Sequence, residues 1–301
     1  MLLVGIDGGA SHTEAVAGTR PDRVLARWHG GPGAVQPGTE PAAARQIAAA
    51  VRAVVEQAGR AAPPQVVVAG LAGARREQVQ TRVRDLVVEQ LGTETAVHIT
   101  TDGAVALESA FAGQPGIVVC AGSGSIAYAR DTEGGVWRAG GHGWRIGDEG
   151  SGYALARAAL SAVGKALDGR GRDTTLAVRL SRAVGVESAN DLVGWSLEAS
   201  PSQVAALAHE VVNAAADNDD VAQALVGQAA HDLAKHVEAL LPRLDQPDRI
   251  RVALAGGLLT EGSKVRDALI DVLAAAHPDL MICSEPVDPA VGALRLAARL
   301  P

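Results

Sequence analysis

The chain twice repeats a pattern of strand, Gly-rich turn and strand, and this repeat constrains its fold more than any other feature. The apolar run 2–7 leads into the turn Gly-Gly-Ala-Ser and an alternating run over 12–17. In the second half, 117–120, the turn Ala-Gly-Ser-Gly-Ser and 126–130 follow the same order. Short apolar runs bounded by glycines are typical of buried strands, and a short turn between them predicts a hairpin. The repeat therefore predicts two related halves facing each other across a cleft, although their residues differ.

Strand patterns alternate with helical patterns along the rest of the chain, which is typical of an α/β fold. Thr39 and the pair Asp288-Pro289 stand at expected helix starts. Further strands are expected at 24–28, 65–69, 96–100, 136–138, 250–255 and 280–283, and helices at 40–58, 75–90, 102–111, across most of 150–241, at 261–276 and after 288.

The composition is that of a globular protein with a small-molecule partner. Its 301 residues suffice for two domains with cores of their own, and 48% hydrophobic with 20% charged residues exclude a disordered or fibrous chain. The net charge is −7 and the Lys and Arg residues are scattered, so no nucleic-acid partner is expected. Pro115 and several glycines interrupt the uncharged run 109–129, which favours strands over a membrane span. We therefore expect a cytoplasmic protein with no membrane segment, whose Cys120 and Cys283 are buried and reduced.

Both Gly-rich turns could bind phosphate. Glycines let backbone N–H groups approach an anion, neighbouring hydroxyls add donors, and Asp7 could hold Mg²⁺ through water. A Gly-rich turn between strands is also an ordinary hairpin, and this alternative stays open for each turn taken alone. The candidate phosphate-binding residues are Asp7, Gly8, Gly9, Ser11 and Thr13 in the first turn and Gly122, Ser123, Gly124 and Ser125 in the second.

Asp102 lies where an apolar strand gives way to a helical pattern. A carboxylate there could act as a base that accepts a proton from an attacking hydroxyl during phosphoryl transfer. It could equally be a helix N-cap that contributes about 1 kcal/mol to stability. The position alone favours neither role.

The segment 140–152 combines six glycines with Trp144, Asp148 and Glu149. Such glycine density favours a backbone that must come close to a ligand. The two carboxylates could accept hydrogen bonds from sugar hydroxyls. The alternative is that Asp148, Glu149 or Ser151 only caps the following helix.

Gly256 and Gly257 stand between an expected strand and an expected helix. Bare backbone there would suit a nucleotide base or ribose. Most junctions of this kind, however, are packing features.

Together these motifs resemble those of the N-acetylglucosamine kinase and BadF/BadG/BcrA/BcrD ATPase family, in the superfamily of actin, Hsp70 and sugar kinases. The resemblance covers essentially the whole chain. The more specific segments are TTDGA and GWRIGDEGSGY. In chain order, VGIDGGASHT resembles the phosphate-1 loop, ITTDGA the catalytic segment, CAGSGS the phosphate-2 loop, GGHGWRIGDEGSGY the GDEGS segment and VALAGGLL the adenosine motif.

The resemblance implies two RNase H-like domains, 1–113 with 288–301 and 114–287, with ATP and Mg²⁺ in the cleft between them. Asp102 would be the catalytic base, and Asp7 would hold the metal. We expect a homodimer that phosphorylates N-acetylglucosamine or a related amino sugar at its 6-hydroxyl. The expected substrate-binding residues are Ser123, Gly143, Trp144, Asp148, Glu149 and Gln36, and the expected adenosine-binding residues are Gly256 and Gly257.

One loop departs from the family pattern. The amino-sugar kinases usually carry a sugar-contacting Asn in the segment that corresponds to GGPGAVQPG, where this chain has Gly33, Ala34 and Val35. Gln36 could replace that Asn, so the identity of the sugar stays open.

Two other functions stay open. The chain could be a BadF-type ATPase that activates a 2-hydroxyacyl-CoA dehydratase, although Cys120 and Cys283 lie in separate expected strands and do not suit a shared iron–sulfur cluster. It could also be a nucleotide-gated binding protein of the actin or Hsp70 kind.

Overall fold

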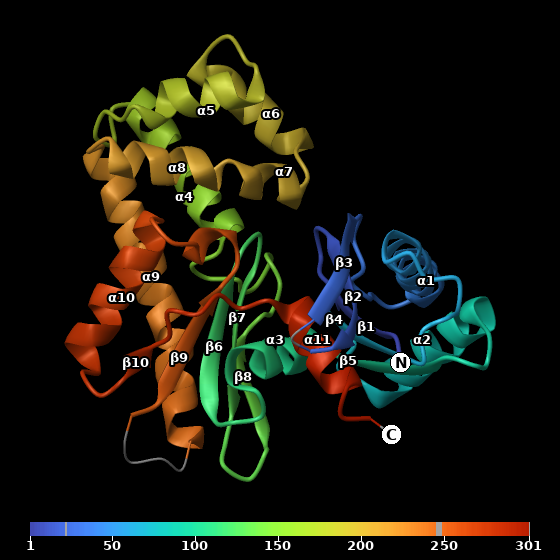
Figure 1. Ribbon diagram of the computed structural model, residues 1–301. Coiled ribbons are helices and arrows are strands. Elements are labelled where there is room, and N and C mark those ends of the chain that lie inside the picture. The colour runs from blue at the N-terminus through green and yellow to red at the C-terminus, as the bar shows by residue number, and fades with distance from the viewer. Residues whose placement is uncertain (22, 245–248, 301) are drawn as a thin grey trace. The chain divides into compact units, whose positions relative to one another are not determined.

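A computed structural model describes residues 1–21, 23–244 and 249–300. The chain divides into two compact units, Met1–Gln114 with Glu285–Pro301, and Pro115–Ser284. Within the described residues, each unit contains one five-stranded sheet with both parallel and antiparallel neighbours (Figure 1). The predicted α/β class is therefore confirmed. None of the described helices has the length and apolar character needed to cross a membrane.

In the first unit the hairpin strand β1 is the centre of the sheet. It pairs antiparallel with β2, as the hairpin pattern predicts, and parallel with β4. Val4 and Ile6 share a core with helices α1 and α2, whereas Leu3 packs with α3 and α11, so alternate side chains bury both faces. The strand order is β3 (Arg23–Gly30), β2 (Thr13–Arg20), β1 (Leu3–Gly8), β4 (Val66–Leu71), β5 (Ala96–Thr101), and the helices are α1 (Glu40–Gln57), α2 (Glu77–Leu91), α3 (Asp102–Phe111) and α11 (Pro289–Ala297).

Helix α11 returns the end of the chain to the first sheet. A Cβ on Gly5 would lie 2.3 Å from the carbonyl oxygen of Ala290, so only glycine allows α11 to approach β1 this closely. The Asp288 side chain accepts a hydrogen bond from the backbone N–H of Val291 at 3.0 Å, which confirms Asp288 as the predicted N-cap.

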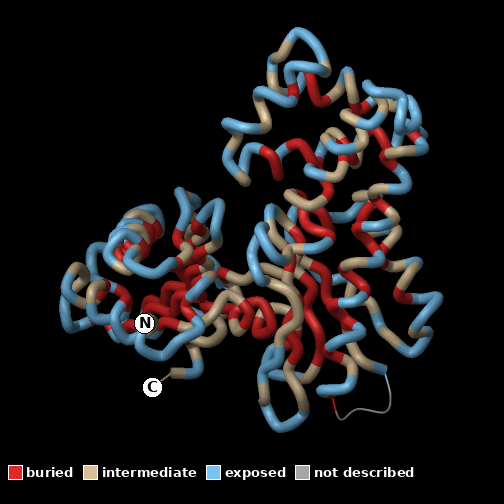
Figure 2. Tube along the Cα trace, turned by 180° about the vertical axis from the view of Figure 1, so that it is seen from behind, coloured by how far each residue is buried: buried red, intermediate tan, exposed pale blue. Residues whose placement is uncertain are grey.

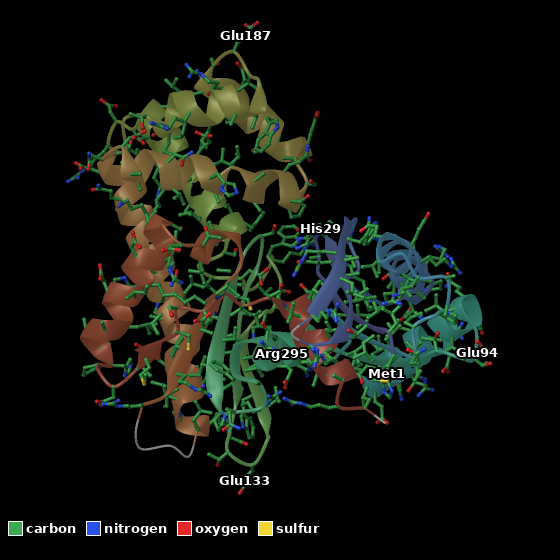
Figure 3. All side chains as sticks on the ribbon, viewed as in Figure 1. Met1, His29, Glu94, Glu133, Glu187 and Arg295 are labelled. Carbon is green, nitrogen blue, oxygen red and sulfur yellow. The ribbon has the colours of Figure 1, made fainter. Side chains whose placement is uncertain are left out.

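In the second unit β6 takes the place that β1 has in the first, with its hairpin partner on one side and a parallel strand on the other. Strand β6 is antiparallel to β7 and parallel to β9, and Figure 2 shows the buried stretches that its sheet shares with the adjoining helices. Charged side chains such as Glu133 and Glu187 project from its turns and loops (Figure 3). The order is β10 (Met281–Ile282), β9 (Arg251–Ala255), β6 (Gly116–Ala121), β7 (Ser125–Arg130), β8 (Val136–Gly140), with α4 (Gly152–Leu167), α5 (Leu176–Val184), α6 (Leu192–Glu198), α7 (Pro201–Ala206), α8 (Ala208–Ala216), α9 (Asp220–Leu240) and α10 (Lys264–Ala276).

Three local predictions need correction. Helix α10 begins at Lys264 instead of Glu261, because Gly257–Leu259 form a 3-10 turn first. Thr39 precedes α1 as predicted, but its hydroxyl bonds with the backbone of Gln36 and not with the helix. Cys120 and Cys283 are partly exposed instead of buried.

Candidate functional site

The β1–β2 turn is fastened to the loop that follows β3. Gly9 closes the hairpin by donating to the carbonyl of His12 at 2.9 Å, and its own carbonyl accepts from the backbone of Gly33 at 3.1 Å. Thr13 is fully buried and its hydroxyl donates to the carbonyl of Gly31 at 2.7 Å. In this conformation the Thr13 hydroxyl ties two loops together, and its binding of phosphate stays a prediction. Ser11, in contrast, is exposed at the tip of the turn.

Carboxylates gather at the end of β1. Burial and, in decreasing order of importance, the negative charges of Asp102, Glu14 and Asp288 together raise the pKa of Asp7 to about 7. Arg27 donates to Asp288 at 2.7 Å and also to Glu14, so these two acids share one guanidinium. A site with this excess of negative charge suits a cation.

The donor set at Asp7 fits Mg²⁺. Among the described residues, no three His, Cys, Asp or Glu side chains are placed to enclose an ion by themselves. Mg²⁺ in phosphoryl-transfer sites usually keeps several waters and uses only one or two carboxylates together with the phosphates. Asp7, with Asp102 close enough to raise its pKa, could supply that small number of protein ligands.

Asp102 is the first residue of α3 and is not its N-cap. Thr101 has that role, since its hydroxyl accepts from the backbone N–H of Ala104 at 3.2 Å. The Asp102 carboxylate accepts from the adjacent N–H of Gly103 at 2.9 Å. Asp7 is the last residue but one of β1, and Asp102 directly follows β5; both strands belong to one parallel set, β1, β4 and β5. Ligand sites of α/β sheets usually lie at the carboxyl edge of the parallel strands, so the structure favours the reactive role over the capping role.

In the second unit the turn 121–125 and the Gly-rich loop 140–151 form one bonded assembly. The N–H of Gly152 donates to the carbonyl of Gly122 at 2.7 Å. Ser125, only 3% exposed, donates its hydroxyl to the carbonyl of Glu149 at 2.6 Å. Ser125 thus repeats the role of Thr13, and the binding of phosphate by its hydroxyl likewise stays a prediction. Ser123 lies at the tip of the turn, where its carbonyl accepts from the backbone of Tyr153 at 3.3 Å.

Asp148 points toward this turn. Its backbone has a left-handed conformation with φ of 59°, which is unusual for a non-glycine residue. Partial burial raises the pKa of its carboxyl group, while hydrogen bonds from the backbone N–H groups of Gly143 and Ser125 oppose that rise. A Cβ on Gly124 would lie 3.0 Å from the Asp148 carboxylate, so a larger residue there would require that side chain to shift.

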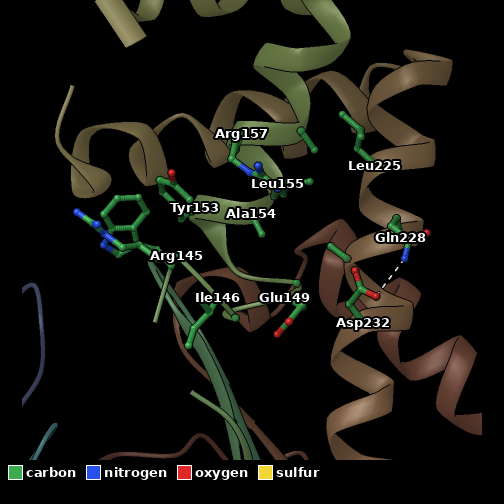
Figure 4. A pocket seen from close by; sticks show the side chains of 15 residues that line it. Arg145, Ile146, Glu149, Tyr153, Ala154, Leu155, Arg157, Leu225, Gln228 and Asp232 are labelled. Carbon is green, nitrogen blue, oxygen red and sulfur yellow. Dashed lines mark hydrogen bonds between the residues drawn. The ribbon is translucent and has the colours of Figure 1, made fainter. Parts of the chain in front are cut away.

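Glu149 points to a different part of the unit. Its carboxylate lies 3.8 Å from the imidazole of His236 on α9. Together with Trp144 it lines a cavity of about 620 Å³ whose other walls are α4 and α9 (Figure 4). Ser151 is the N-cap of α4, accepting from Ala154 at 3.1 Å, so neither acid is the helix cap. The two adjacent carboxylates therefore have different neighbours within the unit.

The remaining predicted ligand-binding residues differ in how closely other atoms surround them. Gly256, with φ of 92°, would place a Cβ 2.4 Å from the carbonyl oxygen of Ala121, whereas a Cβ on Gly257 meets no atom within 4 Å. Gly256 is thus a packing residue and Gly257 faces open space. In the loop that departs from the family pattern, Val35 is buried while Gln36 is exposed.

A model of the BadF/BadG/BcrA/BcrD ATPase family matches residues 4–297. The chain belongs to this family. It is 29% identical over 299 residues to an N-acetylmuramic acid/N-acetylglucosamine kinase of Clostridium acetobutylicum, covering 98% of this chain and 97% of the relative. It is also 29% identical to an N-acetyl-D-glucosamine kinase of Dictyostelium discoideum, with the same coverage.

Solved structures show the same fold. A candidate N-acetylglucosamine kinase from Chromobacterium violaceum superposes with a TM-score of 0.81 and 32% identity, covering 98% of both chains. Membership of this family implies the use of ATP.

Several residues near the candidate site could not be singled out from the sequence as functional. Glu14 and Arg27 lie in ordinary strand patterns, and Asp288 stood out only as a helix cap. His236 falls in a helical segment that looks like scaffold, and only its approach to Glu149 distinguishes it.

Proposed function

We propose that the chain is an ATP-dependent kinase that phosphorylates N-acetylglucosamine or a related amino sugar at its 6-hydroxyl. One observation carries the proposal. Asp102 starts α3 without capping it, near the partly buried Asp7, at the carboxyl edge of a parallel strand set. The names of two relatives that match nearly the full chain support the amino sugar as acceptor. We further propose that the enzyme is a cytoplasmic homodimer.

In this proposal Asp102 accepts the proton of the acceptor hydroxyl as the phosphoryl group moves. Mg²⁺, when bound at Asp7, neutralises charge on the ATP phosphates. The exposed Ser11 of the first turn would add a hydroxyl donor to phosphate, and the tip of the turn 122–124 in the second unit would add donors of its own. Gly257 leaves its backbone open to adenosine.

The acceptor would be held mainly by the second unit. Asp148 is fixed by two backbone N–H groups and keeps capacity for sugar hydroxyls. Ser123, Gly143, Trp144 and Glu149 would complete the contacts there. In the first unit the exposed Gln36 would take the place of the missing Asn.

The test is coupled ADP release with N-acetylglucosamine, N-acetylmuramic acid, glucosamine, N-acetylmannosamine and glucose. We expect turnover that depends on both Mg²⁺ and an N-acetylated sugar, with sugar-free ATP hydrolysis lower by at least about tenfold. Phosphorylation at the 6-hydroxyl is checked by NMR of the product. A 6-deoxy analogue is the matched control and should give no product.

Two outcomes would overturn the proposal. ATP hydrolysis indifferent to every sugar would favour a nucleotide-gated binding protein. A coloured, iron-containing preparation would favour a dehydratase activator, although Cys120 in β6 and Cys283 just after β10 belong to different strands.

A further inference from the structure

The Gly-rich loop 140–151 rests on one face of α9. Gly140 has φ of 72°, and a Cβ there would lie 2.7 Å from Nε2 of His236. Gly150 has φ of 77°, and a Cβ there would lie 2.7 Å from the carbonyl oxygen of Ala229 and 2.6 Å from Cγ of Leu233. Residues 229, 233 and 236 are spaced by four and three, so they share one helix face. Both ends of the loop are therefore glycine because α9 lies directly against them.

His236 is buried beneath the start of this loop. Only 8% of it is exposed, and among the described residues its Nδ1 finds no hydrogen-bond partner. Burial lowers the pKa of the imidazole, while the charges of Glu149, Asp232 and Asp148 oppose that shift. The ring is accordingly neutral near pH 7 and carries one N–H.

The burial pattern indicates which nitrogen holds that proton. A buried donor without a partner costs more free energy than an under-used acceptor. We infer that Nδ1 is unprotonated and that Nε2–H faces the Glu149 carboxylate, whose nearest oxygen is 3.8 Å away. This distance exceeds a direct hydrogen bond, and a small rotation of the Glu149 side chain would close it.

Glu149 is placed to meet a ligand. Its side chain is 54% exposed and lines the cavity between the loop, α4 and α9, as Figure 4 shows. Asp232, which lines the same cavity from α9, already accepts from Gln228 at 3.1 Å and Lys235 at 3.0 Å. A volume of about 620 Å³ lies within the range of small-molecule sites, roughly 300–1,000 Å³.

We propose that His236 is a positioning residue of the acceptor site, holding Glu149 on the cavity wall where its carboxylate accepts hydrogen bonds from hydroxyl or amide N–H groups of the amino sugar. This rests on the proposed kinase function. His236 touches neither substrate, so its loss acts on sugar binding through Glu149 and leaves ATP binding and the chemical step intact.

The test compares His236→Gln with His236→Asn. The Gln amide nitrogen can reach the place of Nε2, whereas the shorter Asn amide reaches only the place of Nδ1. We expect His236→Asn to raise the KM for the sugar about fivefold to tenfold, with kcat and the KM for ATP within about twofold of the wild type. His236→Gln should restore most of the sugar affinity.

His277→Asn is the matched control. The imidazole of His277 lies 3.5 Å from Glu238, a similar His–Glu pair that does not line the cavity, and its loss should leave the sugar KM unchanged. Equal effects of Gln and Asn at position 236, or an unchanged sugar KM in both, would overturn the inference. So would a rise in both KM values with a lower melting temperature, since that pattern marks a purely structural residue. Absence of sugar-dependent turnover in the wild type would instead defeat the proposed function itself.

Discussion

The hairpins of the two units fasten their neighbouring loops in the same way. Thr13 pairs with Gly8 at the start of β2, and Ser125 pairs with Ala121 at the start of β7. Each is buried, and each donates its hydroxyl to a carbonyl in the loop after the third strand, at Gly31 or Glu149. In both units, then, a buried hydroxyl joins the hairpin to the loop.

The charges of the two units differ at matched positions. Asp7 stands opposite Glu14 across the first hairpin, whereas the corresponding residue of β6 is Cys120, opposite Ile126. The first unit thus concentrates carboxylates at its sheet edge. The second carries Asp148 and Glu149 on its loop instead. A common framework therefore supplies, on our proposal, a base and a cation site in one unit and sugar contacts in the other.

The largest effect should come from removing the base of the first unit. Asp102→Asn keeps the size of the side chain but cannot accept the proton, so turnover should fall by about 10²–10⁴-fold with the KM for ATP little changed. Asp148→Asn in the second unit should act mainly on the KM for the sugar. Coupled ADP release measures both variants. Asp85→Asn, on an exposed surface of α2, is the control and should keep normal turnover. Near-normal turnover of Asp102→Asn would contradict the assignment of the base to the first unit.

The second effect concerns stability at the carboxylate cluster. The pKa of Asp7 is about 7 in the folded chain against 3.8 for the free group, so the folded state binds more protons between these values. The free energy of unfolding should therefore fall as pH rises from about 4 to 7, by up to roughly 4 kcal/mol. Asp7→Asn should remove this slope. Urea unfolding from pH 4 to 8, with EDTA present, measures the free energy of unfolding of the wild type and of the variant. If the difference between these two free energies did not change with pH, the expectation would be contradicted.

The sequence predicted the framework well because its signals are local. Apolar runs bounded by glycines placed both hairpins, and Asp288-Pro289 marked the start of α11. The direction of side chains could not be read in this way. Thr13 bonds to a residue 18 positions away and Ser125 to one 24 positions away, and such loop paths depend on tertiary packing.

The sequence identified the candidate site residues, but it could not predict which of them lie next to one another. Asp148 and Glu149 looked equivalent, yet the left-handed backbone at Asp148 turns them toward different neighbours. No periodicity encodes that conformation. For the same reason Arg27 and His236, which contact the acids from other elements, could be found only in three dimensions.

A third prediction separates packing glycines from an open one. Gly73 and Gly256 follow the matching strands β4 and β9, both with positive φ, and a Cβ would lie 2.0 Å from Val35 O and 2.4 Å from Ala121 O. Alanine at either position should destabilise the fold by about 2–4 kcal/mol, from backbone strain and the clash together. Gly257→Ala should change stability by less than about 1 kcal/mol and raise the KM for ATP. Thermal unfolding and kinetics of the three variants check this; equal destabilisation by Gly257→Ala would refute its open role.

The smallest effect tests the two buried hydroxyls directly. Thr13→Val should cost about 0.5–1 kcal/mol of unfolding free energy, because the carbonyl of Gly31 still accepts from Gln46 at 3.1 Å. Ser125→Ala should cost more, about 1–2 kcal/mol. Within the described part of the chain, the Glu149 carbonyl accepts a hydrogen bond from Ser125 and has no second donor like Gln46. Urea unfolding ranks the two variants. If either variant instead raised the KM for ATP at unchanged stability, its hydroxyl would face the nucleotide, and the parallel between the hairpins would fail.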